Sequence, residues 1–155
     1  MLAHVYRFEV QESESTLMAS NVVVNNILMC MFIVPPNNLA IRGSSNTPGE
    51  LDTVTIECNV TANPPADITW LKRTSEGIKK LINTSRTSIT HQITSTSRGP
   101  VTISTLVVSN VDAADDGDYI CEARSSPSSP HVFTNFSISI ISKSDLFGVH
   151  GTKMI

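Results

Sequence analysis

Three cysteines, Cys30, Cys58 and Cys121, are the residues of this 155-residue chain best suited to covalent chemistry. An odd number of cysteines predicts one disulfide pair and one remaining thiol. A remaining thiol more often packs as a small hydrophobic group than takes part in redox chemistry. Because disulfides persist in oxidising compartments, a pair here would indicate an extracellular protein.

The chain also contains a cluster of acidic residues, and carboxylates are the ligands that calcium takes in proteins. Asp112, Asp115, Asp116 and Asp118 lie within seven positions. An EF-hand loop that began at Asp112 would require a glutamate at its twelfth position, where this chain has Ala123. We therefore interpret the cluster as a solvated corner with one paired aspartate, and we predict no metal site.

Catalytic patterns are not found. The four histidines, His4, His91, His131 and His150, are scattered without metal-ligand spacing. No serine lies in a Gly-x-Ser-x-Gly elbow, and no glycine-rich phosphate loop follows a predicted strand. The net charge of −3 provides no basic field for nucleic acid. The sequence thus predicts a non-enzyme without cofactor, small-molecule substrate or nucleic-acid partner.

The hydrophobic pattern predicts β-strands. With 40% hydrophobic and only 16% charged residues, the chain suits a folded domain. Residues 52–60 alternate strictly, which places Val54, Ile56, Cys58 and Val60 on one face. Further strands are expected near 39–41, 68–70, 79–82, 86–96, 102–109, 119–123 and 136–140. The predicted fold class is all-β.

One motif identifies the kind of β-fold. Residues 115–121 read Asp-x-Gly-x-Tyr-x-Cys, and the only tryptophan, Trp70, lies twelve positions after Cys58. Upstream, Leu106, Val108 and Val111 keep a regular spacing to Asp115. Over residues 35–142 the chain resembles the immunoglobulin superfamily, most closely its intermediate-set domains. The resemblance implies an immunoglobulin-like Greek-key β-sandwich of two antiparallel sheets.

The resemblance also implies roles for single residues. It pairs Cys58 with Cys121 across the core, with Trp70 packed on the bridge and Tyr119 holding the corner before the second cysteine. A bridge that closes 63 positions would stabilise the fold by roughly 4 kcal/mol. Gly117 and Leu106 complete the core signature. Asp115 is expected to form a salt bridge with Arg86, or else with Arg98.

The ends of the chain do not show this pattern. Residues 1–34 are interpreted as a non-domain leader: a poor signal peptide (initiated at Met1 or Met18), the end of a preceding region, or sequence that does not fold. The apolar run 27–34 is far shorter than the roughly 18 residues that cross a bilayer, so no transmembrane segment is expected. Residues 143–155 are interpreted as a tail or truncated linker.

Three asparagines, Asn59, Asn83 and Asn135, lie in Asn-x-Ser/Thr triplets. Chance alone gives about 2.5 such triplets in this composition, so their number is no evidence of secretion. Each is expected at an outward or exposed position. We therefore predict glycosylation at one or more of them if the chain enters a secretory pathway.

A partner surface is the remaining functional prediction. Leu71, Ile120, Glu122 and Arg124 are expected on the outer face of the sheet that contains the tyrosine strand, and this face is a candidate for protein binding. The predicted function is extracellular recognition or cell adhesion as a module of a receptor, adhesion or matrix protein, with a homophilic or heterophilic protein partner. The alternatives are a structural spacer in a multidomain array, including an intracellular sarcomeric type, and an ectodomain fragment of a receptor enzyme.

Overall fold

The computed structural model describes residues 5–12, 15–24 and 27–142, and strands make up most of this part of the chain. In chain order the elements are β1 (Val5–Glu12), β2 (Ser15–Val24), β3 (Ile27–Gly43), β4 (Val54–Asn63), β5 (Asp67–Thr74), β6 (Gly77–Lys80), β7 (Thr87–Thr96), β8 (Gly99–Val108), the 3₁₀-helix η1 (Ala113–Asp115), β9 (Gly117–Arg124) and β10 (Val132–Ile138). The all-β prediction is confirmed.

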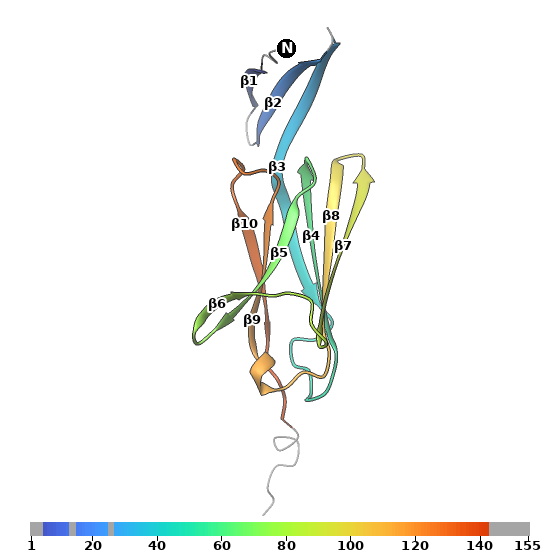
Figure 1. Ribbon diagram of the computed structural model, residues 1–155, viewed down its shortest axis with the longest axis vertical. Helices are drawn as coiled ribbons and strands as arrows, with labels where there is room; N and C mark the ends of the chain where they lie inside the picture. The colour runs from blue at the N-terminus through green and yellow to red at the C-terminus, as the bar shows by residue number, and fades with distance from the viewer. Residues whose placement is uncertain (1–4, 13–14, 25–26, 143–155) are drawn as a thin grey trace, which may run out of the picture.

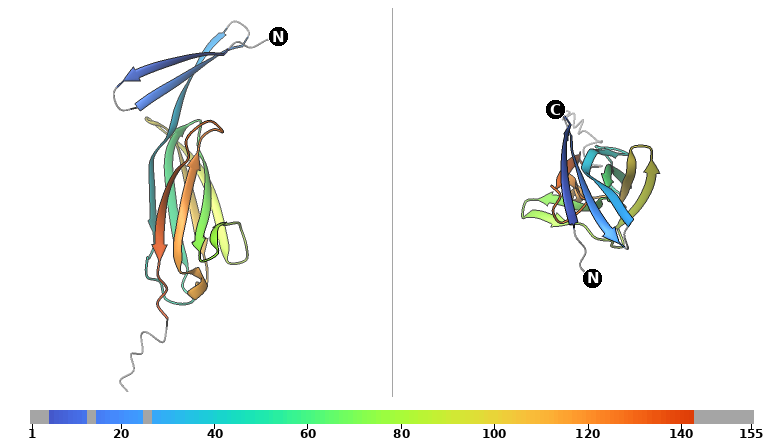
Figure 2. Two further views of the ribbon diagram at one scale, coloured as in Figure 1. Left: turned by 90° about the vertical axis from the view of Figure 1, so that its left-hand side faces the viewer. Right: turned by 90° about the horizontal axis from the view of Figure 1, so that it is seen from above.

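The strands form two antiparallel sheets that pack face to face (Figure 1). One sheet has the order β1-β2-β3-β4-β8-β7, and the other has the order β10-β9-β5-β6. The β1–β2 hairpin extends the first sheet beyond the sandwich, as Figure 2 shows. Strands that neighbour in sequence, such as β4 and β5, lie in different sheets, which gives the predicted immunoglobulin-like sandwich.

Strand β3 continues through Pro35 and Pro36, although neither proline has a register partner on β4. Up to Ile33 the strand pairs with β2, and from Val34 onward it pairs with β4. The register with β4 shifts on both sides of Asn37. The prolines, which cannot donate to a ladder, therefore lie where β3 exchanges one partner for the other. The domain boundary at residue 35 stays a prediction.

The hydrophobic core forms because successive side chains of a strand point to opposite faces of the sheet. On β4, the inward positions are buried and the outward ones are at least partly exposed. Inward residues of β5, β8 and β9 meet them between the sheets. Buried residues of the core include Val54, Ile56, Cys58, Val60, Ile68, Trp70, Leu106, Val108, Val111, Tyr119, Cys121, Ala123 and Ile138.

Some element bounds differ from the sequence prediction. The last strand, β10, begins at Val132 rather than near Phe136, and β6 ends at Lys80 although a strand was expected over 79–82. On β10 the exposed Phe133 and the partly buried Thr134 interrupt the hydrophobic alternation, and on β6 all four residues are exposed. The predicted tail at 143–155 and the side chain of Cys30 lie outside the part of the chain that the structure describes.

Candidate functional site

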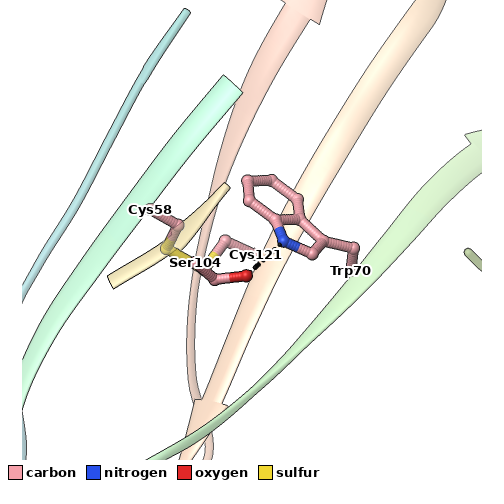
Figure 3. Close-up of a disulfide and its surroundings, with 4 residues drawn as sticks. All are labelled: Cys58, Trp70, Ser104 and Cys121. Atoms are coloured by element: carbon pink, nitrogen blue, oxygen red, sulfur yellow. Dashed lines mark hydrogen bonds between the residues drawn. A yellow bond between two sulfur atoms is a disulfide. The ribbon is translucent and has the colours of Figure 1, made fainter. Parts of the chain in front are cut away.

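A disulfide joins the two sheets at the centre of the core. Cys58 on β4 and Cys121 on β9 are bonded, and their Cα atoms lie 6.4 Å apart. Trp70 on β5 is buried close by, and its Nε1 donates a hydrogen bond of 2.8 Å to Ser104 Oγ on β8 (Figure 3). The bridge and the indole together link β4, β5, β8 and β9.

Sequence reasoning did not identify Ser104 as a partner of Trp70. Ser104 is fully buried, and its hydroxyl is the acceptor that the indole N–H requires inside an apolar core. The sequence does indicate that Ser104 points inward, because it lies two positions before the inward residue Leu106 and alternate residues of a strand face the same side. The hydrogen bond itself joins β5 to β8, which lie in different sheets, and the sequence does not predict that these two residues face each other.

The end of the sandwich around η1 is held by Arg86. Its guanidinium contacts Asp115 and donates to Asp112 Oδ2 at 3.0 Å, and it also donates to the carbonyl of Asn110 at 2.7 Å. Arg98, the alternative partner, lies in the turn between β7 and β8. Asp112 caps η1 by accepting from Ala114 N.

Tyr119 stabilises the turn around η1, which we call the corner, from the inner side of the sandwich. Its hydroxyl donates to the carbonyl oxygen of Asp115 at 2.9 Å. Burial, with the nearby Asp115 carboxylate as a smaller cause, raises the pKa of the Tyr119 hydroxyl well above its ordinary value. The phenol therefore stays protonated and remains a donor.

Lys72 is a buried cation that sequence reasoning missed. It is 8% exposed, and its Nζ donates to the carbonyl of Ala114 at 2.6 Å and lies 5.2 Å from the centre of the Tyr119 ring. Burial lowers the pKa of the Lys72 amine, and the Asp115 carboxylate partly offsets this effect. Lys72 lies two positions after Trp70 on β5, so the alternation of the strand predicts that its side chain also points inward. We assign it to the structure of the corner.

The four clustered aspartates all have partners within the protein. The Arg86 guanidinium donates hydrogen bonds to the carboxylates of Asp115 and Asp112. Asp116 Oδ2 accepts a hydrogen bond from Ile140 N at 3.1 Å. Asp118 Oδ1 accepts from Ser137 Oγ at 2.5 Å. Among the described residues, no group of three or more His, Cys, Asp or Glu side chains is placed to hold a metal ion. The cluster is thus a network that builds the corner.

The outer face of the β10-β9-β5-β6 sheet carries a different kind of feature. Ile120 is paired in register with Leu71 on one side and Asn135 on the other. Ile120 is 7% exposed although it lies outside the core cluster. It forms the floor of an open hollow of about 230 Å³, lined by Leu71, Arg73, Ile78, Ile120, Glu122 and Phe133. We call these six residues the outer-face hollow.

The rim of the hollow is apolar at two edge strands and polar elsewhere. Phe133 on β10 is 75% exposed, and Ile78 on β6 is 59% exposed. Arg73 forms an ion pair with Asp118, with 3.8 Å between Nε and Oδ2. The hollow thus has an apolar centre and exposed apolar walls with charge at its border.

Two predicted binding residues already have local partners. Glu122 Oε1 lies 2.5 Å from His131 Nδ1. The guanidinium of Arg124 donates to the carbonyls of Ser126 and Pro127 in the β9–β10 loop. Arg124 therefore shapes this loop, whereas Leu71 and Ile120 lie in the hollow. Phe133 and Ile78, which sequence reasoning did not place there, come from edge strands whose pairing fixes the face.

The three sequon asparagines lie at different places. Asn59 is on β4 of the other sheet and half-buried, and Asn83 is exposed between β6 and β7. The side-chain oxygen of Asn83 accepts from Ile89 N at 2.6 Å. Asn135 is exposed on β10, beside Ile120.

Comparison with solved structures finds the same architecture. A chain of the titin M10–obscurin like 1 Ig complex has 16% identity and a TM-score of 0.51, over 70% of this chain and 95% of that chain. The mouse nectin-like molecule 4 ectodomain (Ig1–Ig3) has 19% identity and a TM-score of 0.55, over 86% of this chain and 45% of that chain. Dpr2 Ig1–Ig2 in complex with DIP-Theta Ig1–Ig3 gives 17% identity and a TM-score of 0.50, over 80% of this chain and 40% of that chain.

At these identities the likeness shows the fold alone. A search of curated proteins found no match. In the described part of the chain, no helix is long and apolar enough to cross a membrane. Residues 36–125, which are more than half of the chain, match the sequence model of the family described as "Immunoglobulin domain". The chain therefore belongs to the immunoglobulin domain family.

Proposed function

We propose that this chain is a non-catalytic recognition module that acts outside the cell, as part of a receptor, adhesion or matrix protein. It binds a protein partner, either a second copy or another protein, through the outer-face hollow. The observation that supports this proposal most directly is the apolar centre of an otherwise polar sheet face, with Phe133 and Ile78 exposed at its walls.

The composition of this face fits an interface. Fully buried centres of interfaces are apolar and aromatic, and their rims are polar. Here Ile120 and Leu71 form the floor, Phe133 is the aromatic group, and the Arg73–Asp118 ion pair lies at the border. A partner that covers the hollow would remove the exposed apolar walls from water, which is the main source of favourable free energy in association.

The scaffold behind the face supports the same proposal. Strands β5 and β9, which carry the floor of the hollow, are held from inside by Trp70 and by the Cys58–Cys121 bond. A rigid support lowers the entropy lost when a partner binds. A stable disulfide also favours an oxidising, extracellular compartment.

The proposal is tested with chain secreted into the bacterial periplasm, which forms the disulfide without adding glycan. The protein is measured against immobilised ectodomains that contain immunoglobulin domains, and against itself. Ile78→Ser should weaken binding roughly tenfold or more. Ile93→Ser is the matched control, because Ile93 on β7 is also 59% exposed but lies on the other sheet.

Ile120→Lys gives a stricter test, because it places a charge in the floor of the hollow. Ile120 is nearly buried, so circular dichroism and a melting curve must first show that this variant folds. The proposal is wrong if the parent binds neither itself nor any ectodomain. It is also wrong if bound partners do not distinguish the Ile78 variant from the Ile93 variant.

A second function, a structural spacer in a multidomain array, is favoured by the path of the chain. Strand β3 enters the sandwich at one end and β10 finishes toward the opposite end, which suits a head-to-tail array (Figure 2). An intracellular array keeps its cysteines reduced. Mass measurement of protein from its native source under non-reducing conditions distinguishes the two: free thiols at Cys58 and Cys121 favour the spacer.

A further inference from the structure

The sequon at Asn135 lies at the outer-face hollow. Asn135 is exposed on the edge strand β10, and its register partner on β9 is Ile120, the floor of the hollow. Opposite residues of antiparallel strands point to the same face of the sheet. A sugar attached to Asn135 would therefore start on the face that the proposed function uses.

Phe133 lies two positions before Asn135 on the same strand, so both side chains point to the same face. The distance along the strand between such positions is roughly 7 Å, which is short enough for a sugar on Asn135 to contact the Phe133 ring. Phe133 is 75% exposed although it is a large apolar group. The flat C–H face of a pyranose ring is apolar, and it would cover this ring and remove its surface from water.

The hollow beside Phe133 has room for such a ring. Its volume is about 230 Å³, whereas an apolar cavity of roughly 150 Å³ takes up benzene, which is also a six-membered ring. Apolar groups lie at its floor and wall, and Arg73 and Glu122 provide polar groups for the sugar hydroxyls. The other sequons lack this setting: Asn59 lies on β4 of the other sheet, and Asn83 lies in the connection between β6 and β7.

We propose that Asn135 carries an N-linked glycan whose first N-acetylglucosamine packs on Phe133 and covers the outer-face hollow. The glycan then controls the surface: chains with an unmodified Asn135 expose the hollow to a partner, and glycosylated chains do not. This inference rests on the extracellular setting and the binding face of the proposed function.

The modification has a defined chemistry. The side-chain amide nitrogen of Asn135 forms a bond to C1 of the first sugar of an oligosaccharide carried on a lipid pyrophosphate. The bond between C1 and the pyrophosphate oxygen breaks, the lipid pyrophosphate leaves with the electron pair, and one amide proton is released. Ser137 supplies the hydroxyl that the acceptor triplet requires.

The first experiment measures the packing without any partner. The chain is secreted from animal cells that make high-mannose glycans, and occupancy of Asn135 is measured by peptide mass. Endoglycosidase H then trims each glycan to one N-acetylglucosamine. Four proteins are compared by melting temperature: the parent, Phe133→Ser, Asn135→Gln, and the double variant.

The sugar on Asn135 should raise the melting temperature by roughly 4 °C when Phe133 is present, and should have little effect in the Phe133→Ser background. Asn59→Gln, made in the parent and in Phe133→Ser, provides the control, since any sugar on Asn59 should stabilise the two backgrounds equally. An unoccupied Asn135 overturns the inference. So does a stabilisation by the Asn135 sugar that does not depend on Phe133.

The second experiment measures the covering of the hollow. Asn135→Gln and the fully glycosylated parent, both from animal cells, are compared in the binding assay described above. Asn135→Gln should bind its partner roughly tenfold or more tightly than the glycosylated parent. Equal binding by the two overturns the control of the surface by the glycan.

The outcomes separate this inference from the proposed function. If no form binds any partner but the melting temperatures show coupling to Phe133, the binding function fails while the packing of the sugar stands. If Asn135→Gln and the bacterial protein bind but Asn135 is unoccupied in animal cells, the glycan inference fails while the binding function stands.

Discussion

Arg86 and Asp115 form an ion pair at the end of the sandwich, although they are 29 positions apart in the sequence. The Arg86 guanidinium also contacts Asp112 and the carbonyls of Ser109 and Asn110. One side chain thus ties the start of β7 to the turn that leads into β9.

Replacing Arg86 should therefore destabilise the fold more than an ordinary surface arginine does. We expect Arg86→Ala to lower the free energy of unfolding by about 2 kcal/mol, measured by urea denaturation. The value stays below that of a fully buried pair because the Arg86 side chain is 41% exposed and solvent screens the charges. Arg42→Ala is the control, since the Arg42–Glu57 pair is more exposed and should cost less than about 1 kcal/mol. Equal losses in the two variants would contradict this role.

The hydrogen bond between Trp70 and Ser104 leads to a second prediction. Ser104→Ala should lower the free energy of unfolding by about 1–3 kcal/mol, because it leaves the indole N–H buried without an acceptor. Trp70 is the only tryptophan, so its fluorescence follows unfolding directly. Ser88→Ala, an exposed change on β7, should have little effect. A Ser104 variant as stable as the Ser88 variant would show that the bond contributes nothing.

Gly117 and Gly77 form a natural pair for testing backbone geometry. Their φ angles, +123° and +125°, are both unfavourable for other residues. A Cβ on Gly117 would lie 3.3 Å from the carbonyl oxygen of Arg73, whereas a Cβ on Gly77 would meet nothing within 4 Å. Both alanine variants should lose about 1–3 kcal/mol from backbone strain. Gly117→Ala should lose more, and thermal denaturation of the two variants measures the difference.

Tyr119 leads to a prediction of pH dependence. Its folded-state pKa is raised above the ordinary value of 10.0, mainly by burial and secondly by Asp115. Above pH 10 the unfolded tyrosine releases its proton while the folded one keeps it, so the folded state binds more protons. Stability should therefore fall with rising pH in this range.

Tyr119→Phe cannot ionise and should lose this part of the pH dependence, although it loses the hydrogen bond to Asp115 at every pH. Urea denaturation between pH 9 and pH 11 in a Cys30→Ser background, which removes the third cysteine, measures the difference. If the gap in stability between the parent and the Phe variant does not narrow above pH 10, Tyr119 is not the group responsible.

Much of the fold was predictable because alternation is a local property of a strand. The parity of residues 52–60 placed Cys58 inward, and the parity around Tyr119 and Cys121 did the same for β9. The Asp-x-Gly-x-Tyr-x-Cys motif added the family. Strands β6 and β10 were placed less well, since all four residues of β6 are exposed and the outward Phe133 and inward Thr134 interrupt the hydrophobic alternation of β10.

What the sequence by itself determined is therefore which residues face inward and the kind of sandwich that they build. Only the tertiary structure decided which outward residues of β6 and β10 join Leu71 and Ile120. The contact of Phe133, Ile78, Leu71 and Ile120 around one hollow depends on the register of four strands, and so does the place of Asn135 beside it. The same holds for Trp70 and Ser104, which lie in different sheets. Parity is set by the local geometry of each strand, whereas register is set by the packing of the whole domain.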